Sequence, residues 1–593
     1  MRIISFAHRF RNWLFPNDES FPTVDSADYN RPTVLFITSI VFYCIYLLAM
    51  QPEWVLGGEM WAEMATNYYP NSTASSIAVK FFSTDAGYIP LPQRILAFIG
   101  SSLNLPATSI PYFYTWSAIL ATGIMVGAFC LRPFRVLVKS DFLRFWAAIA
   151  VLMLADFGTR TFINFTYFSA FLVAVVTALA LVERSHEVPR WSWFVPIFML
   201  SKPAVLSVLP AMILVAFVGK TRFRLITIVS SILGLAQLIR MAFSHSAGTM
   251  HWVSKSDFTL IDKLIASIKY FVGLLGAFFA GRLPVELYQP MWFGLLLLVV
   301  CVYILMRRRT HSGALILVGL SILFFSVLLN VFALSNFWSP NMERLVSPPE
   351  VTPSLGFRMY RHSMVGYCGV ILVVVGMISA VVNQNQGRFY SAIPGVAPTL
   401  FLVWFYISGW FSFAGTLNRT PDFPRLNNSQ WQNMASVIDS GAAVCVPTEP
   451  ITWLFRRNCS RLAPIGPSHN LYVDDFNRSH YFQPLPVSGI SSSVDLPVQE
   501  VSDNRALLAL AVFVKPITAQ AMDANAQADI VMKDGSTKYL LGSRELPSEG
   551  GLLMLSSKVP ISINEIREIT LSIDRPVELA YLSNDPIVMW MGN

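Results

Sequence analysis

Long apolar runs recur through the first 412 residues and are separated by short polar or basic segments. Each run is long enough to cross about 30 Å of hydrocarbon at a helical rise of about 1.5 Å per residue. The pattern therefore predicts membrane-spanning helices rather than a water-soluble core. These runs are residues 33–50, 112–131, 144–159, 167–183, 225–243, 289–306, 314–334, 363–383 and 392–412.

Residues 191–219 form an apolar stretch of a different kind, because Pro196, Pro203 and Pro210 interrupt it. Proline lacks a backbone N–H and ends or bends a helix. Basic residues flank both ends of the stretch, so both ends are expected on the same side of the membrane. The sequence therefore predicts two short helices that enter and return, with Ser201-Lys202-Pro203 at the turn, for a total of about eleven membrane helices.

Residues 262–281 are also apolar, but they lie between two segments that the charge bias places outside. We expect them to form a helix on the outer surface of the membrane. Residues 1–31 are polar and are predicted to be a cytoplasmic N-terminal segment without a cleavable signal peptide. The first span then stays as an anchor of the transmembrane domain, residues 32–412.

The two largest outside regions are the first loop, residues 51–111, and the C-terminal region, residues 413–593. The second region is about the size of one ordinary domain. Its short β-prone runs are separated by glycine, proline and aspartate turns. The expected fold is thus an α-helical polytopic membrane protein with a C-terminal, β-rich extracytoplasmic domain, which we expect to be a sandwich. The runs lie at 508–514, 529–532, 551–556 and 569–573.

Composition supports the membrane assignment. The chain is 54% hydrophobic and only 13% charged, whereas soluble domains have about 25% charged residues. The net charge of +8 could indicate nucleic-acid binding in a soluble protein, but here the basic residues abut apolar runs, as in cytoplasmic loops. Nucleic acid is therefore not an expected partner. These residues are Arg9, Arg11, Arg132, Arg135, Lys139, Lys220, Arg222, Arg224, Arg307, Arg308 and Arg309.

Four of the six cysteines fall within predicted spans, whereas Cys445 and Cys459 lie close together in the C-terminal region. A domain outside the membrane is in an oxidising compartment, which favours a disulfide between these two cysteines over two free thiols. No CxxC pair or His/Cys cluster with zinc-site spacing occurs in the sequence, so we expect no structural metal.

The first outside loop carries the most informative carboxylates. Glu59 and Glu63 are four residues apart and would share one face of a helix, where mutual repulsion raises a carboxylate pKa. A raised pKa suits a general base at neutral pH. The alternative is the solvated face of a surface helix.

Asp85 and Arg94 bracket a turn, Ala86-Gly87-Tyr88, farther along the same loop. Gly87 and the prolines that follow favour a turn at this point. The two charges are candidates for a site, and the alternative is a structural salt bridge between them.

Several cations lie next to apolar helices on the side predicted to be outside. Arg160 follows the third run, Lys202 lies at the proline break, and Arg358 and Arg361 precede a late run. Such cations can simply extend toward lipid headgroups. Lys202 is the exception, because a lysine at a helix break within a bundle lines a cavity more naturally than it faces lipid.

Together, carboxylates and cations on one side of a helical bundle meet the electrostatic needs of sugar transfer from a lipid phosphate. The leaving phosphate needs positive charge, and the acceptor hydroxyl needs a carboxylate to remove its proton. In its acidic first loop, its Ala86-Gly87-Tyr88 to Arg94 segment, its Ser201-Lys202-Pro203 break and its Arg358-Met359-Tyr360 element, the chain resembles the polytopic GT-C class glycosyltransferases. The most similar subgroup is the phage-encoded O-antigen glucosyltransferase type.

This resemblance covers residues 30–415 and implies a polyprenyl-phosphate sugar donor, a lipid-linked or surface polysaccharide acceptor, and transfer on the periplasmic side with inversion. It implies Glu63 as the base, with Glu59 or Asp85 as a second carboxylate because Met64 stands where relatives often have another acid. It places Lys202 and Arg358 near the donor phosphate, with Arg94, Arg160 and Arg361 as weaker candidates. No cofactor is required, although some GT-C enzymes use a divalent metal. The C-terminal domain could bind the acceptor glycan.

Two other function classes stay open. A transporter or flippase of lipid-linked glycans would show two halves with matching hydropathy and ionisable residues at mid-membrane, and neither is evident. A non-catalytic assembly protein would tolerate neutralisation of Glu63. The resemblance favours a bacterial inner membrane, but predicted outside sequons such as those at Asn71, Asn418 and Asn477 keep an endoplasmic-reticulum enzyme open.

Overall fold

The computed structural model describes most of the helical region and most of the C-terminal strands. The described residues are 9, 11–15, 30–155, 157–182, 189–219, 222–244, 259–281, 290–333, 361–384, 395–417, 430–441, 444–448, 453–457, 481–498, 506–518, 520–546, 548–582, 585–586 and 588–592. Within them the chain divides into two compact units, the first made of 1–50, 76–95 and 117–423, and the second of 51–75, 96–116 and 424–593.

Eight helices in the described part of the chain are long and apolar enough to cross a membrane. Their interiors are almost free of charged residues, as spanning helices require. The chain is thus a polytopic helical membrane protein. The helices are α2 (Arg31–Met50), α7 (Ile110–Gly127) extended by η3 (Ala128–Cys130), α10 (Ser169–Val182) preceded by η5 (Phe165–Phe168), α13 (Arg222–Ala242), α14 (Leu260–Ala280), α15 (Pro290–Arg308), α16 (Gly313–Ala333) and α18 (Arg361–Gln384).

A bent helix pair passes the same test, as either a broken span or a re-entrant loop, and its bend confirms the break predicted from the prolines. Helices η6 (Arg190–Phe194) and α11 (Val195–Phe198) form its first half, and η7 (Pro203–Val208) and α12 (Leu209–Val218) form its second half. The two halves meet at an angle of 117°. Proline lies at the start of α11, η7 and α12, where its missing N–H is tolerated, so the backbone bends between these helices.

The count of eight or nine spans differs from the expected eleven, because two predicted runs are too short to cross, the bent pair counts as at most one span, and α14 is added. The run at 144–159 is helical only as α8 (Asp141–Met153), and the run at 392–412 divides into α19 (Val396–Ile407) and α20 (Trp410–Leu417). A helix of 12 or 13 residues is about 20 Å long, which is shorter than the hydrocarbon layer. Apolar composition alone therefore overcounted the helices that can cross.

Residues 262–281, which were expected to lie on the outer surface of the membrane, form the candidate span α14. Helix α14 has 21 residues and satisfies the same length and hydropathy test as the other spans. Its backbone lies against α15, because a Cβ at Gly294 would stand 1.8 Å from the Val272 carbonyl oxygen.

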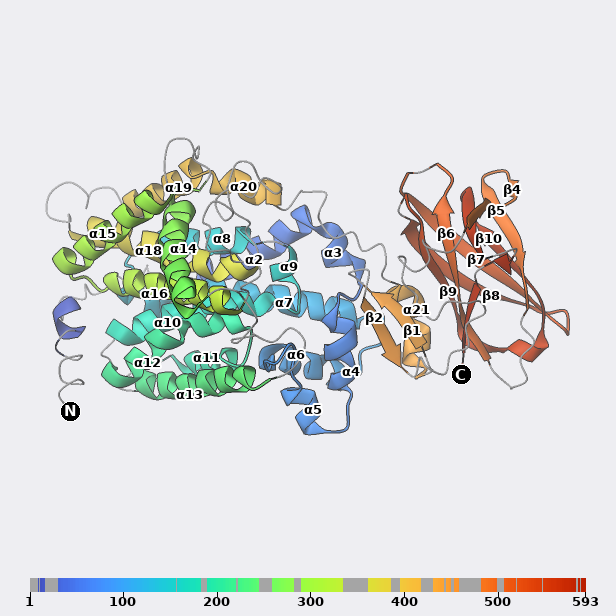
Figure 1. Ribbon diagram of the computed structural model, residues 1–593, viewed down its shortest axis with the longest axis horizontal. Coiled ribbons are helices and arrows are strands. Elements are labelled where there is room, and N and C mark those ends of the chain that lie inside the picture. The colour runs from blue at the N-terminus through green and yellow to red at the C-terminus, as the bar shows by residue number, and fades with distance from the viewer. Residues whose placement is uncertain are drawn as a thin grey trace. The chain divides into compact units, whose positions relative to one another are not determined.

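Helices α16, α10, α12 and α13 lie side by side in the first unit (Figure 1). Helix α18 packs on α16 through two glycines: a Cβ at Gly319 would be 2.4 Å from the Gly369 carbonyl oxygen, and one at Gly369 would be 2.5 Å from the Gly319 carbonyl oxygen. Small residues allow such close backbone approach in membrane bundles.

Gly319→Ala is therefore expected to destabilise the bundle by about 1–3 kcal/mol, the usual effect of overpacking a core. Thermal unfolding of the detergent-purified protein measures this change. Gly415→Ala is the matched control, because nothing lies within 4 Å of a Cβ at Gly415. Equal stability of the two variants would contradict a tight α16–α18 contact.

One of the basic residues assigned to cytoplasmic loops is buried instead of exposed. The Arg11 guanidinium donates hydrogen bonds to the Leu181 carbonyl oxygen at 2.6 Å and to the Val218 carbonyl oxygen at 3.3 Å. These carbonyls lie at the C-terminal ends of α10 and α12, where helices leave acceptors unsatisfied. A cation there is also favoured by the helix dipoles.

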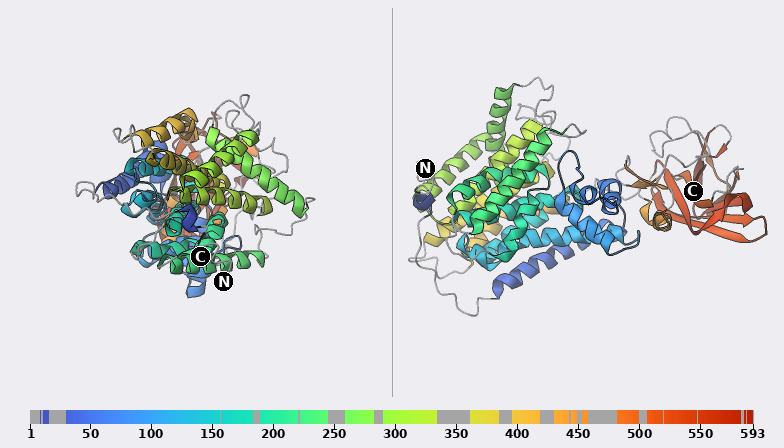
Figure 2. Two further views of the ribbon diagram at one scale, coloured as in Figure 1. Left: turned by 90° about the vertical axis from the view of Figure 1, so that its left-hand side faces the viewer. Right: turned by 90° about the horizontal axis from the view of Figure 1, so that it is seen from below.

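The second unit contains an antiparallel sheet of eleven strands that forms a half-barrel (Figures 1 and 2). Its principal order is β12-β11-β6-β9-β8-β7-β10-β5-β4, with β13 beside β6 and β3 beside β11. The strands are β3 (Tyr481–Pro484), β4 (Val487–Ser488), β5 (Ser491–Leu496), β6 (Ala506–Pro516), β7 (Met522–Met532), β8 (Thr537–Leu546), β9 (Gly551–Ser562), β10 (Ile566–Ile573), β11 (Val577–Leu582), β12 (Asp585–Pro586) and β13 (Val588–Gly592).

The predicted β-rich domain is confirmed, but its sheet is continuous rather than a sandwich of two sheets. The junction is the pairing of Leu541 on β8 with Ser556 on β9. Alternate residues of β7, such as Ala526, Ala528 and Ile530, face the buried core of the half-barrel. Alternation of this kind shows that one face is buried, but it does not show whether neighbouring sheets are joined.

The second unit also contains parts of the first loop and a small module that precedes the half-barrel. The module consists of α21 (Trp431–Asp439) and a two-stranded sheet of β1 (Val444–Thr448) and β2 (Trp453–Arg457). The first loop contains α3 (Pro52–Gly57), the π-helix η2 (Met64–Tyr68), α4 (Tyr69–Ser72), α5 (Ile77–Phe82) and α6 (Leu91–Ser102). Of these, residues 51–75 and 96–116 belong to the second unit.

Candidate functional site

The break in the bent helix pair carries a buried cation. Lys202 lies between α11 and η7, where the backbone leaves the helical conformation, and its side chain is only 7% exposed. Its ammonium donates a hydrogen bond to the Tyr88 hydroxyl. Burying an ammonium is unfavourable unless polar groups surround it. Lys202 is thus held in a polar site within the protein and does not extend toward lipid headgroups.

The Tyr88 hydroxyl joins this cation to a carboxylate. Asp85 and Tyr88 exchange two backbone hydrogen bonds, of 2.9 and 3.0 Å, around Ala86 and Gly87, which have φ angles of 44° and 86°. Positive φ at both central residues defines a type I′ turn and explains the glycine. The turn brings the Tyr88 side chain back to Asp85, the first residue of the turn, and the Tyr88 hydroxyl donates to Asp85 Oδ2 at 3.0 Å.

Gln237 on α13 holds the two irregular segments together. Its side-chain amide donates to the carbonyl oxygens of Ile89 and Ser201 at 3.1 and 3.2 Å, and its oxygen accepts from the Ile89 amide at 3.3 Å. The Leu91 amide also donates to the Leu200 carbonyl oxygen at 2.8 Å. These bonds make Asp85, Tyr88 and Lys202 one network in the first unit.

Two predicted arginines are buried in the same unit, each 1% exposed. Arg94 lies in the first turn of α6. Arg160, at the end of α9 (Phe157–Arg160), donates to the carbonyl oxygens of Met153 and Leu152 at 2.9 and 3.3 Å, and its guanidinium lies 5.5 Å from the centre of the Tyr46 ring. These carbonyls terminate α8, so Arg160 has a structural role in addition to any role in a site.

The two glutamates of the first loop do not share a helix face. Helix α3 ends at Gly57 with Gly58 in the left-handed conformation, and the next helical segment begins only after Glu63. The premise that Glu59 and Glu63 repel each other along a helix is therefore wrong. The two adjacent glycines were a helix-stop signal that the four-residue spacing concealed.

Their surroundings differ. The Glu59 carboxylate accepts hydrogen bonds from the Trp431 and Gln432 amides at 3.0 and 3.4 Å. Glu63 is half-buried and lies between Ala62, which has a φ angle of +42°, and the π-helix η2. Strained backbone and π-helical turns are frequent at functional sites, which makes Glu63 the more distinctive position.

Part of the predicted site lies outside the described residues. This applies to Arg358 and Cys459 as whole residues, and to the side chains of Arg361 and Cys445. The disulfide between Cys445 and Cys459 and the phosphate contacts of Arg358 and Arg361 therefore stay predictions. Among the described cysteines, Cys44, Cys130, Cys301 and Cys368 are free thiols.

Sequence reasoning missed three polar residues. Tyr88 and Gln237 complete the network around Lys202, and only Tyr88 lay within a segment that the sequence had marked. The third is Lys263 on the inner face of α14, 8% exposed, with its ammonium 5.8 Å from the centre of the Phe332 ring. The sequence signal was the spacing that puts Lys263 on one helix face with Ser267 and Tyr270, a face that is buried in the structure.

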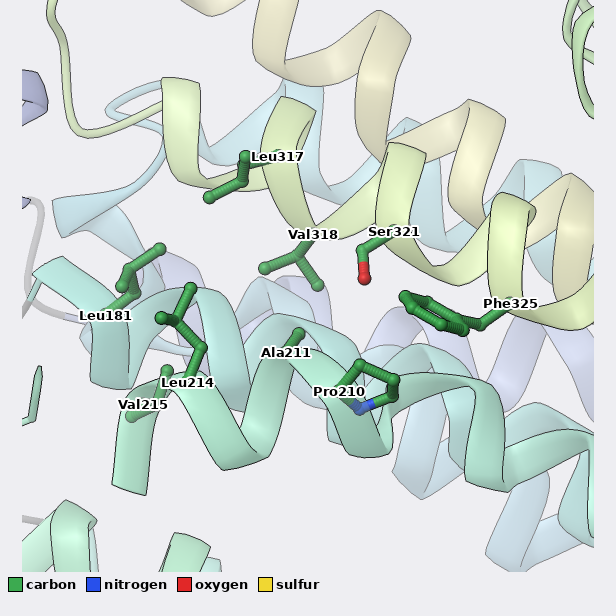
Figure 3. A pocket seen from close by; sticks show the side chains of 9 residues that line it. All are labelled: Leu181, Pro210, Ala211, Leu214, Val215, Leu317, Val318, Ser321 and Phe325. Carbon is green, nitrogen blue, oxygen red and sulfur yellow. The ribbon is translucent and has the colours of Figure 1, made fainter. Parts of the chain in front are cut away.

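An apolar hollow of about 240 Å³ lies between α12 and α16 (Figure 3). Pro210, Ala211 and Leu214 line one side, and the Val318 and Phe325 side chains face them from α16. Only the Ser321 hydroxyl adds a polar side-chain atom to this lining. The hollow is suited to a hydrocarbon chain and not to charged chemistry.

The chemistry-bearing groups of the first unit are thus a desolvated ammonium and a carboxylate joined through one hydroxyl. An ammonium in a site of low dielectric constant stabilises an anion strongly, and a carboxylate can accept a proton. Within the residues that the structure describes, no three His, Cys, Asp or Glu side chains form a group that could hold a metal ion.

Comparisons with models of known protein families, with curated proteins and with solved structures found no significant match to this chain.

Proposed function

We propose that this protein is a membrane glycosyltransferase of the GT-C kind, which transfers a hexose such as glucose from a polyprenyl-phosphate donor to a lipid-linked or surface polysaccharide. The observation that carries the proposal is the buried Lys202 ammonium at the break of a bent membrane helix pair, linked through Tyr88 to the Asp85 carboxylate. A phosphate-linked donor needs a desolvated cation of this kind.

The reaction is a single displacement. An acceptor hydroxyl attacks the anomeric carbon of the donor sugar, the bond from that carbon to the phosphate oxygen breaks, and the electron pair leaves with the phosphate. The hydroxyl proton passes to a carboxylate. Lys202 stabilises the phosphate as it leaves, so no general acid is needed on that side.

Glu63 is the proposed base, and Asp85 is the second carboxylate. The left-handed Ala62 and the π-helix on either side of Glu63 support this choice. Arg358 is proposed to share the phosphate with Lys202, and Arg94, Arg160 and Arg361 are weaker candidates for the same role. No metal takes part in the proposed step.

The lipid part of the donor is apolar, and the hollow beside α12 offers it space. Helix α12 is the second half of the bent pair that carries Lys202. We propose a bacterial inner membrane as the location, with the N-terminus in the cytoplasm and the C-terminal domain in the periplasm. Loop charges support this orientation.

The test is the mass of the surface polysaccharide repeat unit from cells that lack the protein, express it, or express Glu63→Gln at a matched membrane level. Glutamine keeps the side-chain shape and removes the base. We expect a gain of one hexose with the wild type and a loss of transfer of about 10²–10⁴-fold in the variant. Glu53→Gln is the control, because Glu53 is exposed in the same loop.

Each outcome separates the hypotheses. A hexose gain that survives Glu63→Gln keeps the enzyme and moves the base to Asp85 or Glu59. An unchanged mass in every strain would overturn the glycosyltransferase and leave a transporter or flippase of lipid-linked glycan as the alternative.

A further inference from the structure

Helix α21 begins on a carboxylate that lies 372 residues earlier in the chain. The Glu59 carboxylate accepts hydrogen bonds from the amides of Trp431 and Gln432, the first two residues of α21. The adjacent Gln430 makes no side-chain capping bond to the helix. Glu59 therefore caps α21 from the first loop, and its negative charge is favoured at the positive end of the helix dipole.

The side chains of α21 bind the first loop at further points. The Trp431 indole donates to the Ala107 carbonyl oxygen at 2.7 Å, and Asp439 accepts from the Ala107 amide at 2.9 Å. Gln432 donates to the carbonyl oxygen of Gly58 and to that of Thr108 at 3.0 Å. Both ends of α21 are thus attached to loop backbone.

An aromatic cluster fixes the segment that follows Glu63. The Trp431 ring is fully buried, and the Tyr69 ring meets it edge to face with centres 5.3 Å apart. Phe455 on β2 completes the cluster, with ring centres 5.3 Å from Trp431 and 5.9 Å from Tyr69. Tyr69 directly follows the π-helix η2, so the position of η2 depends on α21.

Helix α21 also binds the half-barrel. Asn433 donates to the Ser543 carbonyl oxygen at 2.9 Å, and its own carbonyl oxygen accepts from the Ser556 hydroxyl. The Met554 amide donates to the Gln430 side chain at 3.4 Å. The helix therefore lies between the first loop and the sheet, in contact with both.

We propose that α21 is a clamp through which the C-terminal domain holds the segment carrying Glu63, and that Glu59 is the positioning residue of this clamp. The bonds made by Glu59 precede Glu63, and the Tyr69 cluster follows it, so Glu63 and η2 are held at both ends. This inference assigns the C-terminal domain a role in the active site in place of, or in addition to, acceptor binding. Its catalytic part rests on the proposed function.

The clamp itself is tested without any enzyme assay, by hydrogen exchange of the full-length protein in detergent. Loss of a helix cap typically weakens local structure by a factor of about 2–30. Glu59→Ala is therefore expected to raise amide exchange by about 2–30-fold in residues 58–72 and in the first turn of α21, whereas Glu53→Ala leaves both unchanged. Unaltered exchange in Glu59→Ala would overturn the clamp.

Glu59→Gln distinguishes positioning from catalysis. Glutamine keeps one acceptor oxygen for the α21 amides but cannot act as a base. If Glu59 positions the loop, both exchange and kcat in Glu59→Gln lie between those of the wild type and Glu59→Ala, with the donor KM unchanged. If Glu59 is the base, Gln and Ala are equally inactive, and the positioning role is refuted.

Failure of the proposed function gives a different result. A wild type without sugar transfer, combined with faster exchange in Glu59→Ala, refutes the glycosyltransferase and keeps the clamp. A wild type with sugar transfer and no exchange difference in Glu59→Ala refutes the clamp alone.

Discussion

Lys202→Met is expected to lower sugar transfer by about 10²–10³-fold, the usual effect of removing one preorganised group that stabilises developing charge. Methionine keeps most of the length of the lysine side chain and removes its charge. Lys202 is only 7% exposed, so water cannot replace it readily in stabilising a phosphate. The measurement is the rate of hexose transfer by purified protein with a polyprenyl-phosphate sugar.

Lys139→Met serves as the control, because Lys139 is exposed in the loop before α8. Lys202→Arg keeps the charge in a larger and planar group, and it should retain more activity than Lys202→Met. Near wild-type transfer by Lys202→Met would mean that Lys202 has only a structural role.

Asp141→Asn is expected to destabilise the protein by about 3–5 kcal/mol, the typical effect of removing one partner of a buried ion pair. Asp141 Oδ1 lies 2.5 Å from Arg144 Nη2, and Oδ2 lies 2.5 Å from Arg135 Nη2. The Arg144 side chain is fully buried, so the substitution would leave its charge without a carboxylate. Thermal unfolding of the detergent-purified protein measures the loss.

Asp262→Asn is the matched control, because Asp262 caps the exposed start of α14, where a change of about 1 kcal/mol is typical. Equal losses of stability in the two variants would contradict a large stabilising contribution from the Arg135–Asp141–Arg144 cluster.

The pH dependence of the same cluster has a definite sign. Burial by itself raises the pKa of Asp141, but the hydrogen bond from Arg135 and the charges of Arg144 and Arg135 outweigh it, so the pKa is below its usual 3.8. A carboxylate with a lowered pKa contributes stability that is present above pH 3.8 and is lost as the pH falls through the lowered pKa. Asp141→Asn should lack this acid-sensitive step.

Local features of the fold were predictable because the residues that specify them are adjacent in the chain. Prolines 196, 203 and 210 predicted the bent pair, and the turn residues between short β-prone runs predicted the β-rich domain. The number of spans was less predictable. Apolar composition marks a segment as buried, but it does not decide whether a segment such as α8 or α19 is long enough to cross.

The residues of the candidate site were likewise only partly predictable from the sequence. Lys202 was singled out because a lysine beside a proline break within an apolar stretch is unusual. Its partner Tyr88 lies 114 residues away in the chain, and Gln237 lies 36 residues from Ser201, to which its amide donates. Neither could be assigned from the sequence, because these contacts form only when distant segments pack. Side-chain networks of this kind have no signature in local spacing.

The amino-acid sequence by itself thus determined a polytopic membrane protein with one proline-broken helix pair and a β-rich C-terminal domain, because hydropathy, periodicity and proline act over a few turns of chain. The tertiary structure alone decided that the sheet is a half-barrel, that Tyr88 binds Lys202, and that Glu59 caps α21. These features depend on contacts between distant segments, whose free energies are set by close packing and hydrogen-bond geometry in the folded protein.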